Sequence, residues 1–211
     1  VRVVHHGFDP SRHDRSRGGP RDGLDAWLPP GVRYSLIVGQ GSPYKNHPRM
    51  IRAFVAAMGT RSDHKLVLVR RFSRVDSEMT ELLSRPEVQR LVVTIPHVTD
   101  EVLFTLYAHA QMLLFASLYE GFGLPAVEAM GFGLPVLAST AEAVREVTGD
   151  AALHADPYSH DDLVAKIRSL DSDAALRARL VEAGLRRARE FSWERAARAT
   201  LDVYREAAGR R

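Results

Sequence analysis

Two glutamates stand eight positions apart around a glycine-containing turn, in the segment Glu-Gly-Phe-Gly-Leu-Pro-Ala-Val-Glu that runs from Glu120 to Glu128. The apolar run at 111–116 before the turn is typical of a buried strand, and residues 124–130 after it are typical of a helix. Pro125 fits the first helical turn, where a missing N–H costs little. A helix N-terminus carries unpaired N–H groups and partial positive charge, so this segment suits a phosphate-bearing ligand.

The two carboxylates and the glycines between them have different predicted roles. Glu128 lies about one turn into the predicted helix, and its two oxygens could accept both hydroxyls of a ribose. Glu120 precedes the turn and is expected to face the group attached beyond the phosphates. Gly121 and Gly123 allow the backbone to approach a ligand closely. The predicted binding segment is completed by the residues that follow these glycines, Phe122 and Leu124.

The loop after the first predicted strand adds a cation. Lys45 is one of only three lysines in the chain, and it is followed by Asn46, a residue type that suits the cap of the next helix. As a point charge, Lys45 could hold a diphosphate and stabilise the negative charge of a departing leaving group. The alternative role is that of a solvated loop lysine.

Short apolar runs alternate with helical patterns from Tyr34 onward, which predicts an α/β fold: a doubly wound parallel sheet with ligands at the carboxyl ends of its strands. Residues 9–33, rich in Arg, Gly, Pro and Asp, predict a linker with one turn of helix near 24–28. The predicted strands are 34–39, 65–70, 91–95, 111–116, 135–138 and 152–155. The predicted helices are 47–58, 76–84, 99–109, 124–131, 142–147, 159–170, 174–190 and 193–208.

The segment 120–128 resembles the E-x(7)-E signature of retaining glycosyltransferases of family 4, which have the two-domain GT-B fold. The resemblance extends over about residues 34–205 in the family's order. Its further matches are Ile37-Val38-Gly39, Ser42-Pro43-Tyr44-Lys45-Asn46, Thr99-Asp100-Glu101, Ser117 to Ala129, Gly133-Leu134-Pro135-Val136 and Phe191-Ser192-Trp193-Glu194.

The resemblance implies that the chain is one half of a GT-B fold, a Rossmann-like sheet of about six strands with extra C-terminal helices. The implied domains are an interdomain linker and remnant at 1–33, a nucleotide-sugar-binding domain at 34–190 and a C-terminal helix at 191–211. That helix would cross back to an absent N-terminal domain. The chain also begins without Met, as an excised domain would.

The resemblance also implies a reaction: transfer of a hexosyl group of the mannose, rhamnose or glucose type to an unknown acceptor, with retention of configuration. Lys45 would hold the leaving diphosphate, Glu120 the donor-sugar hydroxyls and Glu128 the ribose. These carboxylates bind and position, unlike the acid–nucleophile pair of glycoside hydrolysis. The partners are then a nucleotide-sugar and the missing acceptor domain, without which we expect little or no turnover.

Several positions depart from the family or are open to two interpretations. Many relatives carry arginine five residues before the lysine, where this chain has Gln40, whose amide cannot neutralise a phosphate. Arg70 or Arg71, at the end of the second predicted strand, could compensate, or could be a surface pair. His97 and Val98 follow the third predicted strand, where relatives contact the base; a structural loop histidine is the alternative.

The composition narrows the classes further. A chain of 211 residues with 45% hydrophobic content is typical of a globular domain. It has no cysteine, its nine histidines lack metal-ligand spacing, and we expect neither a protein-held metal nor a cofactor. The net charge of +3 predicts no nucleic-acid partner. No apolar run is long enough to span a bilayer. We expect a cytoplasmic location, with membrane contact only through the absent domain or the acceptor.

Two other functions fit parts of the sequence. Residues 121–126 formally satisfy the G-x-G-x-x-A pattern of a dinucleotide-dependent dehydrogenase, but they follow the fourth predicted strand and not the first. A non-catalytic nucleotide-binding module would not distinguish a nucleotide-sugar from its bare nucleotide, and Glu120 would then have no role. A sugar-nucleotide epimerase shares the fold. The base, the sugar and the acceptor stay open, as does the product: a bacterial polysaccharide, a glycolipid or a glycosylated natural product.

Overall fold

The computed structural model describes residues 2–9, 23–61, 63–71 and 77–209, apart from the side chains of Arg70 and Arg71. In this part of the chain, six strands form one sheet in the order β3-β2-β1-β4-β5-β6, with every pair parallel. The strands are β1 (Arg33–Gln40), β2 (His64–Arg71), β3 (Val92–Ile95), β4 (Leu113–Phe115), β5 (Val136–Ser139) and β6 (Leu153–Ala155). Chain order reverses between β1 and β4, so the crevice of this doubly wound sheet lies there.

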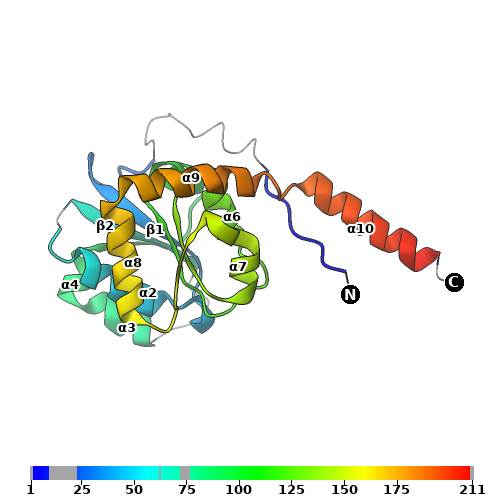
Figure 1. The fold of residues 1–211 in the computed structure, drawn as a ribbon. Coiled ribbons are helices and arrows are strands. Elements are labelled where there is room, and N and C mark those ends of the chain that lie inside the picture. Colours follow the sequence, from blue (N-terminus) through cyan, green and yellow to red (C-terminus); the bar gives the residue numbers. More distant parts are fainter. Residues whose placement is uncertain (1, 10–22, 62, 72–76, 210–211) are drawn as a thin grey trace.

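Helices cover both faces of the sheet (Figure 1). One face packs against α5 (Asp100–His109), α6 (Leu124–Gly131) and α7 (Glu142–Thr148). The other packs against α2 (His47–Met58), α3 (Ser77–Ser84), α4 (Pro86–Gln89) and α8 (His160–Ser172). The helix α9 (Ala174–Ala188) contributes buried residues to both layers. Two short 3₁₀ helices, Pro43–Lys45 and Gly149–Ala151, follow β1 and α7.

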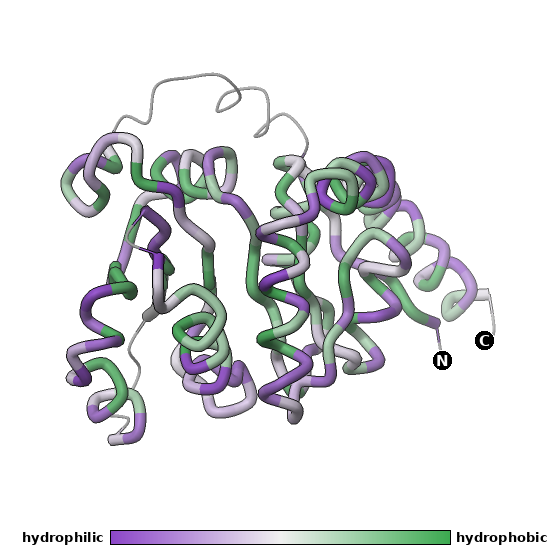
Figure 2. Tube along the Cα trace, turned by 60° about the vertical axis from the view of Figure 1, so that its left-hand side comes forward, coloured by the Kyte–Doolittle hydropathy of each residue, from purple (hydrophilic) through white to green (hydrophobic). Residues whose placement is uncertain are grey.

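The strands alternate their side chains between these two apolar layers. Leu36 of β1 and Leu113 of β4 join one buried cluster, while their neighbours Ile37 and Leu114 join the other. A strand that is buried on both faces must be apolar throughout, which explains the continuous apolar runs in the sequence. Figure 2 shows these hydrophobic strands inside helices of mixed hydropathy.

All six predicted strands and all eight predicted helices are present, with ends that shift by a few residues. The helix α4 was not predicted, because a helix of only four residues, beginning with Pro86, carries no periodic pattern. The predicted turn at 24–28 is formed by a hydrogen bond from Leu28 N to Leu24 O of 2.9 Å. Both leucines are buried in the core, so this part of the predicted linker packs onto the sheet domain.

The helix α10 (Trp193–Ala208) projects away from the sheet domain, beside the N-terminal segment 2–9 (Figure 1). None of its residues is buried. Arg2 forms an ion pair of 2.6 Å with Glu206, and Phe8 N donates to Phe191 O at 2.8 Å. The two ends of the described chain therefore run together, and they meet the sheet domain at the same place.

Candidate functional site

The loops after β1 and β4 meet at the carboxyl edge of the sheet, where its strand order reverses. Lys45 ends the 3₁₀ helix after β1, and Glu120 lies between β4 and α6. Leu118 N donates a hydrogen bond of 2.7 Å to Tyr44 O, which joins the two loops. Ligands of open α/β sheets bind in this crevice, so both predicted residues lie where such a ligand would be held.

Lys45 and Glu120 form an ion pair that is largely removed from water. The Lys45 ammonium lies 2.7 Å from one carboxylate oxygen of Glu120 and 3.0 Å from the other. The side chains are 13% and 8% exposed. A buried charge needs its partner, and removal of either one leaves an uncompensated charge. The pair offers a cation for a phosphate and a carboxylate for hydroxyl groups, side by side.

Asn46 stands at the first position before α2, as predicted, but its side chain makes no capping hydrogen bond. The backbone there is left-handed, with a φ of 58°, and not in the extended region that a capping residue usually adopts. Its amide instead donates to Ala116 O at 3.0 Å and to Pro157 O at 2.9 Å. Asn46 thus occupies the predicted cap position without forming a capping bond, and its side chain ties the Lys45 loop to the end of β4.

The start of α6 is built on Gly123, which has a φ of 108°. A Cβ at this position would also lie 3.3 Å from the Phe115 ring. Gly121 is open, with nothing within 4 Å of a Cβ there, and Leu124 is 39% exposed at the first helical position. The backbone from 121 to 124 is therefore the surface that the site can offer to a phosphate.

Phe122 points away from this surface. Its ring is 9% exposed and lies 5.4 Å from the Phe191 ring, centroid to centroid. The rings of His5 and His6 lie 5.9 Å and 5.3 Å away. Phe122 can therefore contribute only its backbone to the predicted ligand, and its side chain fastens the binding segment to the place where the chain ends meet.

Glu128 is held by a tyrosine that the sequence analysis missed. The hydroxyl of Tyr107, on α5, donates a hydrogen bond of 2.9 Å to a Glu128 carboxylate oxygen. Tyr107 is fully buried, and this burial, reinforced by the negative charge of Glu128, raises the pKa of the phenol well above 10.0. The hydroxyl therefore stays protonated as a donor. Only a polar group at an otherwise apolar helix position hinted at this contact in the sequence.

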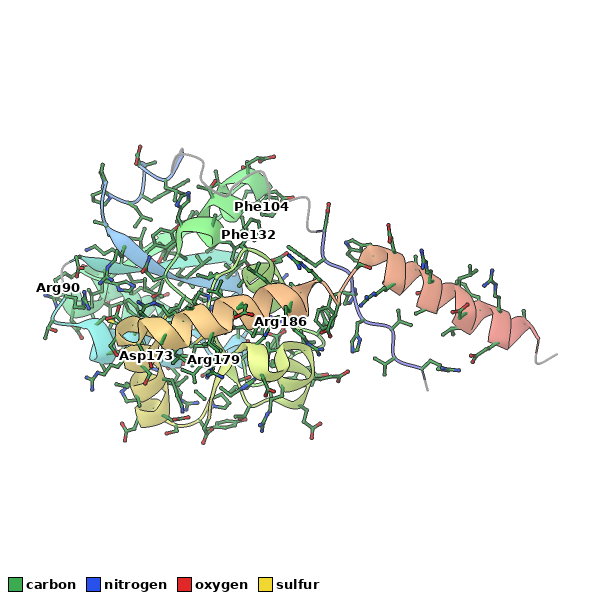
Figure 3. All side chains as sticks on the ribbon, turned by 45° about the horizontal axis from the view of Figure 1, so that its top comes forward. Arg90, Phe104, Phe132, Asp173, Arg179 and Arg186 are labelled. Atoms are coloured by element: carbon green, nitrogen blue, oxygen red, sulfur yellow. The ribbon has the colours of Figure 1, made fainter. Side chains whose placement is uncertain are left out.

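An aromatic stack supports that tyrosine. The Phe132 ring, just after α6, lies 5.6 Å from the Tyr107 ring at an interplanar angle of 12°. The ring of Phe104, also on α5, stacks on the Phe132 ring as well, with their centroids 5.5 Å apart; both residues are labelled in Figure 3. This stack fixes α5 against α6, and hence the phenol against the carboxylate.

The remaining predicted residues lie farther along the same edge. Gln40 ends β1 and is exposed, and its Cα is in register with that of Arg71, as Gly39 is with Arg70. The side chains of both arginines lie outside the described residues. His97 is exposed and Val98 is half-buried after β3, an edge strand that β2 separates from β1.

Among the described residues, no three His, Asp or Glu side chains are grouped so that they could hold a metal ion. In the same residues, no helix is long and apolar enough to cross a membrane.

Known proteins resemble both the sequence and the fold. The O-antigen chain mannosyltransferase B of Escherichia coli is 35% identical over 173 residues, which make up 82% of this chain and 45% of that protein. The MMP alpha-(1->4)-mannosyltransferase of Mycolicibacterium hassiacum is 38% identical over 183 residues, 84% of this chain and 44% of that protein. The chain thus spans less than half the length of these curated relatives.

Among solved structures, a sucrose-phosphate synthase from Thermosynechococcus elongatus aligns with a TM-score of 0.82 over 100% of this chain and 53% of that chain, at 24% identity. The sheet domain is accordingly one half of a GT-B fold. Residues 27–187 match the family model of the glycosyl transferases group 1. The chain belongs to the glycosyl transferases group 1 family.

Proposed function

We propose that this chain is the nucleotide-sugar-binding half of a retaining glycosyltransferase that transfers a hexosyl group. The observation that carries the proposal is the Lys45–Glu120 ion pair at the point where the strand order reverses, next to the start of α6. A nucleotide-sugar combines a diphosphate, a ribose diol and a sugar. Each of these groups finds a matching partner along this edge.

The diphosphate binds at the backbone of 121–124 and at the Lys45 ammonium. In the structure that ammonium is held by both oxygens of Glu120. A diphosphate carries more negative charge than one carboxylate, so its arrival draws the ammonium toward the phosphate oxygens. Glu120 then has free acceptor positions for the hydroxyls of the donor sugar. The same ammonium stabilises the charge that develops on the diphosphate as it leaves.

The ribose binds at Glu128. One carboxylate oxygen already accepts the Tyr107 hydroxyl, which fixes the orientation of the carboxylate. An ionised carboxylate has about four acceptor positions, so the ribose hydroxyls can be accepted as well. In this assignment Glu120 and Glu128 position the donor and do not themselves form a covalent bond to the sugar.

The acceptor site belongs to a second domain. The chain covers less than half of each mannosyltransferase relative, which supports a partner domain that supplies the other wall of the cleft. Alone, the chain binds the donor and turns over little of it. The names of these relatives favour a mannosyl group over rhamnosyl or glucosyl, and the proposal needs no protein-held metal.

Calorimetry tests the proposal. UDP, GDP, dTDP and ADP are titrated into the chain, each bare and carrying a sugar, with Glu128→Ala as the comparison. We expect one nucleotide series to bind, affinity to change when the sugar is present, and Glu128→Ala to weaken binding about tenfold or more. Equal affinity with and without sugar would instead indicate a non-catalytic module. Preference for NAD would overturn the proposal.

A further inference from the structure

Two large aromatic side chains lie exposed beside the Lys45–Glu120 pair. Tyr44 is 41% exposed and Tyr119 is 69% exposed. Each is the direct sequence neighbour of one member of the ion pair. Tyrosine rings usually bury much of their apolar surface, so two exposed rings at the rim of a binding site point to a ligand that covers them.

The two rings are fixed relative to one another and to the site. Their centroids lie 6.5 Å apart in an edge-to-face arrangement, with an interplanar angle of 82°. The hydrogen bond from Leu118 N to Tyr44 O holds the two loops that carry them. The Lys45 ammonium lies 5.5 Å from the centre of the Tyr44 ring. The rings of Tyr44 and Tyr119, called the platform below, therefore form one aromatic surface that begins at the ammonium and continues to the more exposed Tyr119.

The chemistry of this platform matches a sugar. A pyranose has a face of C–H groups that packs on an aromatic ring, and a rim of hydroxyls that can bond to a phenol. A tyrosine supplies both an apolar body and a hydrogen-bonding tip. We propose that Tyr44 and Tyr119 form a sugar-binding subsite that takes a pyranose ring. The inference rests on the proposed function, because the pyranose is either the hexosyl group of the donor or the sugar of the acceptor.

Saturation-transfer NMR tests the subsite. Methyl α-D-mannopyranoside and methyl α-D-glucopyranoside are the probes, and the wild-type chain should transfer saturation to the ring protons of at least one. Tyr119→Ala and Tyr44→Ala should each weaken that glycoside about fivefold, the range expected for one aromatic contact. Tyr119→Phe keeps the ring face and should retain most of the binding.

The matched control is Tyr204→Ala, which removes a tyrosine that is 68% exposed on α10, away from the sheet domain. It should leave the glycoside signal unchanged. Absence of transfer to both glycosides in the wild type, or transfer that survives both alanine substitutions in the platform, would overturn the subsite.

Calorimetry with the sugar nucleotides separates the two sources of the pyranose. If Tyr119→Ala lowers the preference for the sugar-bearing nucleotide over the bare one, the platform holds the donor sugar. If that preference is unchanged while the glycoside signal falls, the platform holds an acceptor sugar that reaches across the cleft from the second domain. Nucleotide binding without any glycoside signal rejects the subsite and keeps the donor-domain assignment. A tyrosine-dependent glycoside signal without nucleotide binding keeps the subsite and rejects the donor-domain assignment.

Discussion

At the scale of single residues, Lys45 and Glu120 depend on each other for stability, apart from their proposed role in binding. With side chains 13% and 8% exposed, each charge depends on the other. Lys45→Met or Glu120→Gln alone should lower the free energy of unfolding by about 3 kcal/mol, because one buried charge loses its partner. The double variant should recover much of that loss. Urea unfolding at neutral pH measures all three variants.

The same variants separate folding from function. The double variant should fold well but still fail to bind a nucleotide, since the cation for the diphosphate is gone. Losses in unfolding free energy that simply add in the double variant would show that the two groups do not interact, contrary to the 2.7 Å contact.

Tyr107 provides a test of the ribose assignment. Tyr107→Phe removes the hydroxyl that orients Glu128, so the affinity for a ribonucleoside diphosphate should fall about tenfold, as for a hydrogen bond to a charged group. A 2′,3′-dideoxy analogue has no diol to offer, and its affinity should stay the same. Calorimetry with both nucleotides measures the difference.

The control for this test is Tyr34→Phe. The Tyr34 hydroxyl is also buried, and it donates a hydrogen bond of 2.9 Å to the backbone oxygen of Leu106 on α5, the helix that carries Tyr107. Its loss should lower stability to a similar extent without changing the discrimination between ribose and dideoxyribose. If both substitutions changed the discrimination between ribose and dideoxyribose equally, Tyr107 would have only a packing role.

At the scale of strands and helices, part of the structure could be predicted from the sequence. Strands that are buried on both faces consist of continuous apolar runs, and strands that alternate with helices form a parallel sheet. The sheet, and the position of Lys45 and Glu120 at its carboxyl edge, were therefore predictable. The direct contact between Lys45 and Glu120 was not predictable, because the two residues are 75 positions apart and no local sequence pattern indicates that they meet. The role of Asn46 and the contact of Tyr107 with Glu128 were missed for the same reason.

The turn before α6 yields a paired prediction. Gly123 has a φ of 108°, and an added Cβ would approach the Phe115 ring at 3.3 Å. Gly123→Ala should therefore lower stability by about 1–2 kcal/mol and displace the helix N-terminus that we propose receives the diphosphate. Gly121→Ala, with open space around the new methyl group, should leave the stability and the position of the helix N-terminus unchanged. A loss of nucleotide affinity in that variant would come from the methyl group on the proposed phosphate surface itself. Thermal unfolding together with nucleotide calorimetry compares the two.

Burial of a histidine at the start of β2 makes stability depend on pH. His64 starts β2 and is buried, which lowers the pKa of its imidazole from 6.5 to about 4, and Asp171 of α8 only partly opposes this shift. Between these two values the unfolded chain binds a proton that the folded chain does not. Stability should therefore fall as the pH drops from about 6.5 to about 4, by up to about 3 kcal/mol.

The measurement is urea unfolding at pH 7 and pH 5 in wild type and His64→Gln. The substitution keeps a polar group for Ser35, whose hydroxyl lies 3.0 Å from the imidazole, and removes the titration. His64→Gln should therefore lose less stability between the two pH values than wild type does. An unchanged pH dependence would assign it to other groups, such as His154, whose pKa burial also lowers.

At the scale of the whole molecule, the folded unit and the projecting helix α10 behave differently. No residue of α10 is buried, and its large apolar side chains include Trp193 at 55% and Leu201 at 47% exposed. The cover that Trp193 has comes from the N-terminal segment, since its ring lies 6.2 Å from the His6 ring. The helix α9, in contrast, buries Leu180 and Ala188, and its Gly184 packs against Met130 of α6. The donor site should therefore depend on α9 and be independent of α10.

Two truncations test this division. A chain that ends after Ser192 should keep its nucleotide affinity within about twofold and its melting temperature within about 2 °C, because little apolar area is lost. A chain that ends after Asp173 loses the buried side of α9 and should not fold cooperatively. If removal of α10 alone abolished nucleotide binding, the helix would have to act through the N-terminal segment, whose residues 5 and 6 contact the Phe122 ring. Because Gly7 packs directly on the Trp193 backbone, Gly7→Ala would then reproduce the loss by displacing the N-terminal segment without shortening the chain.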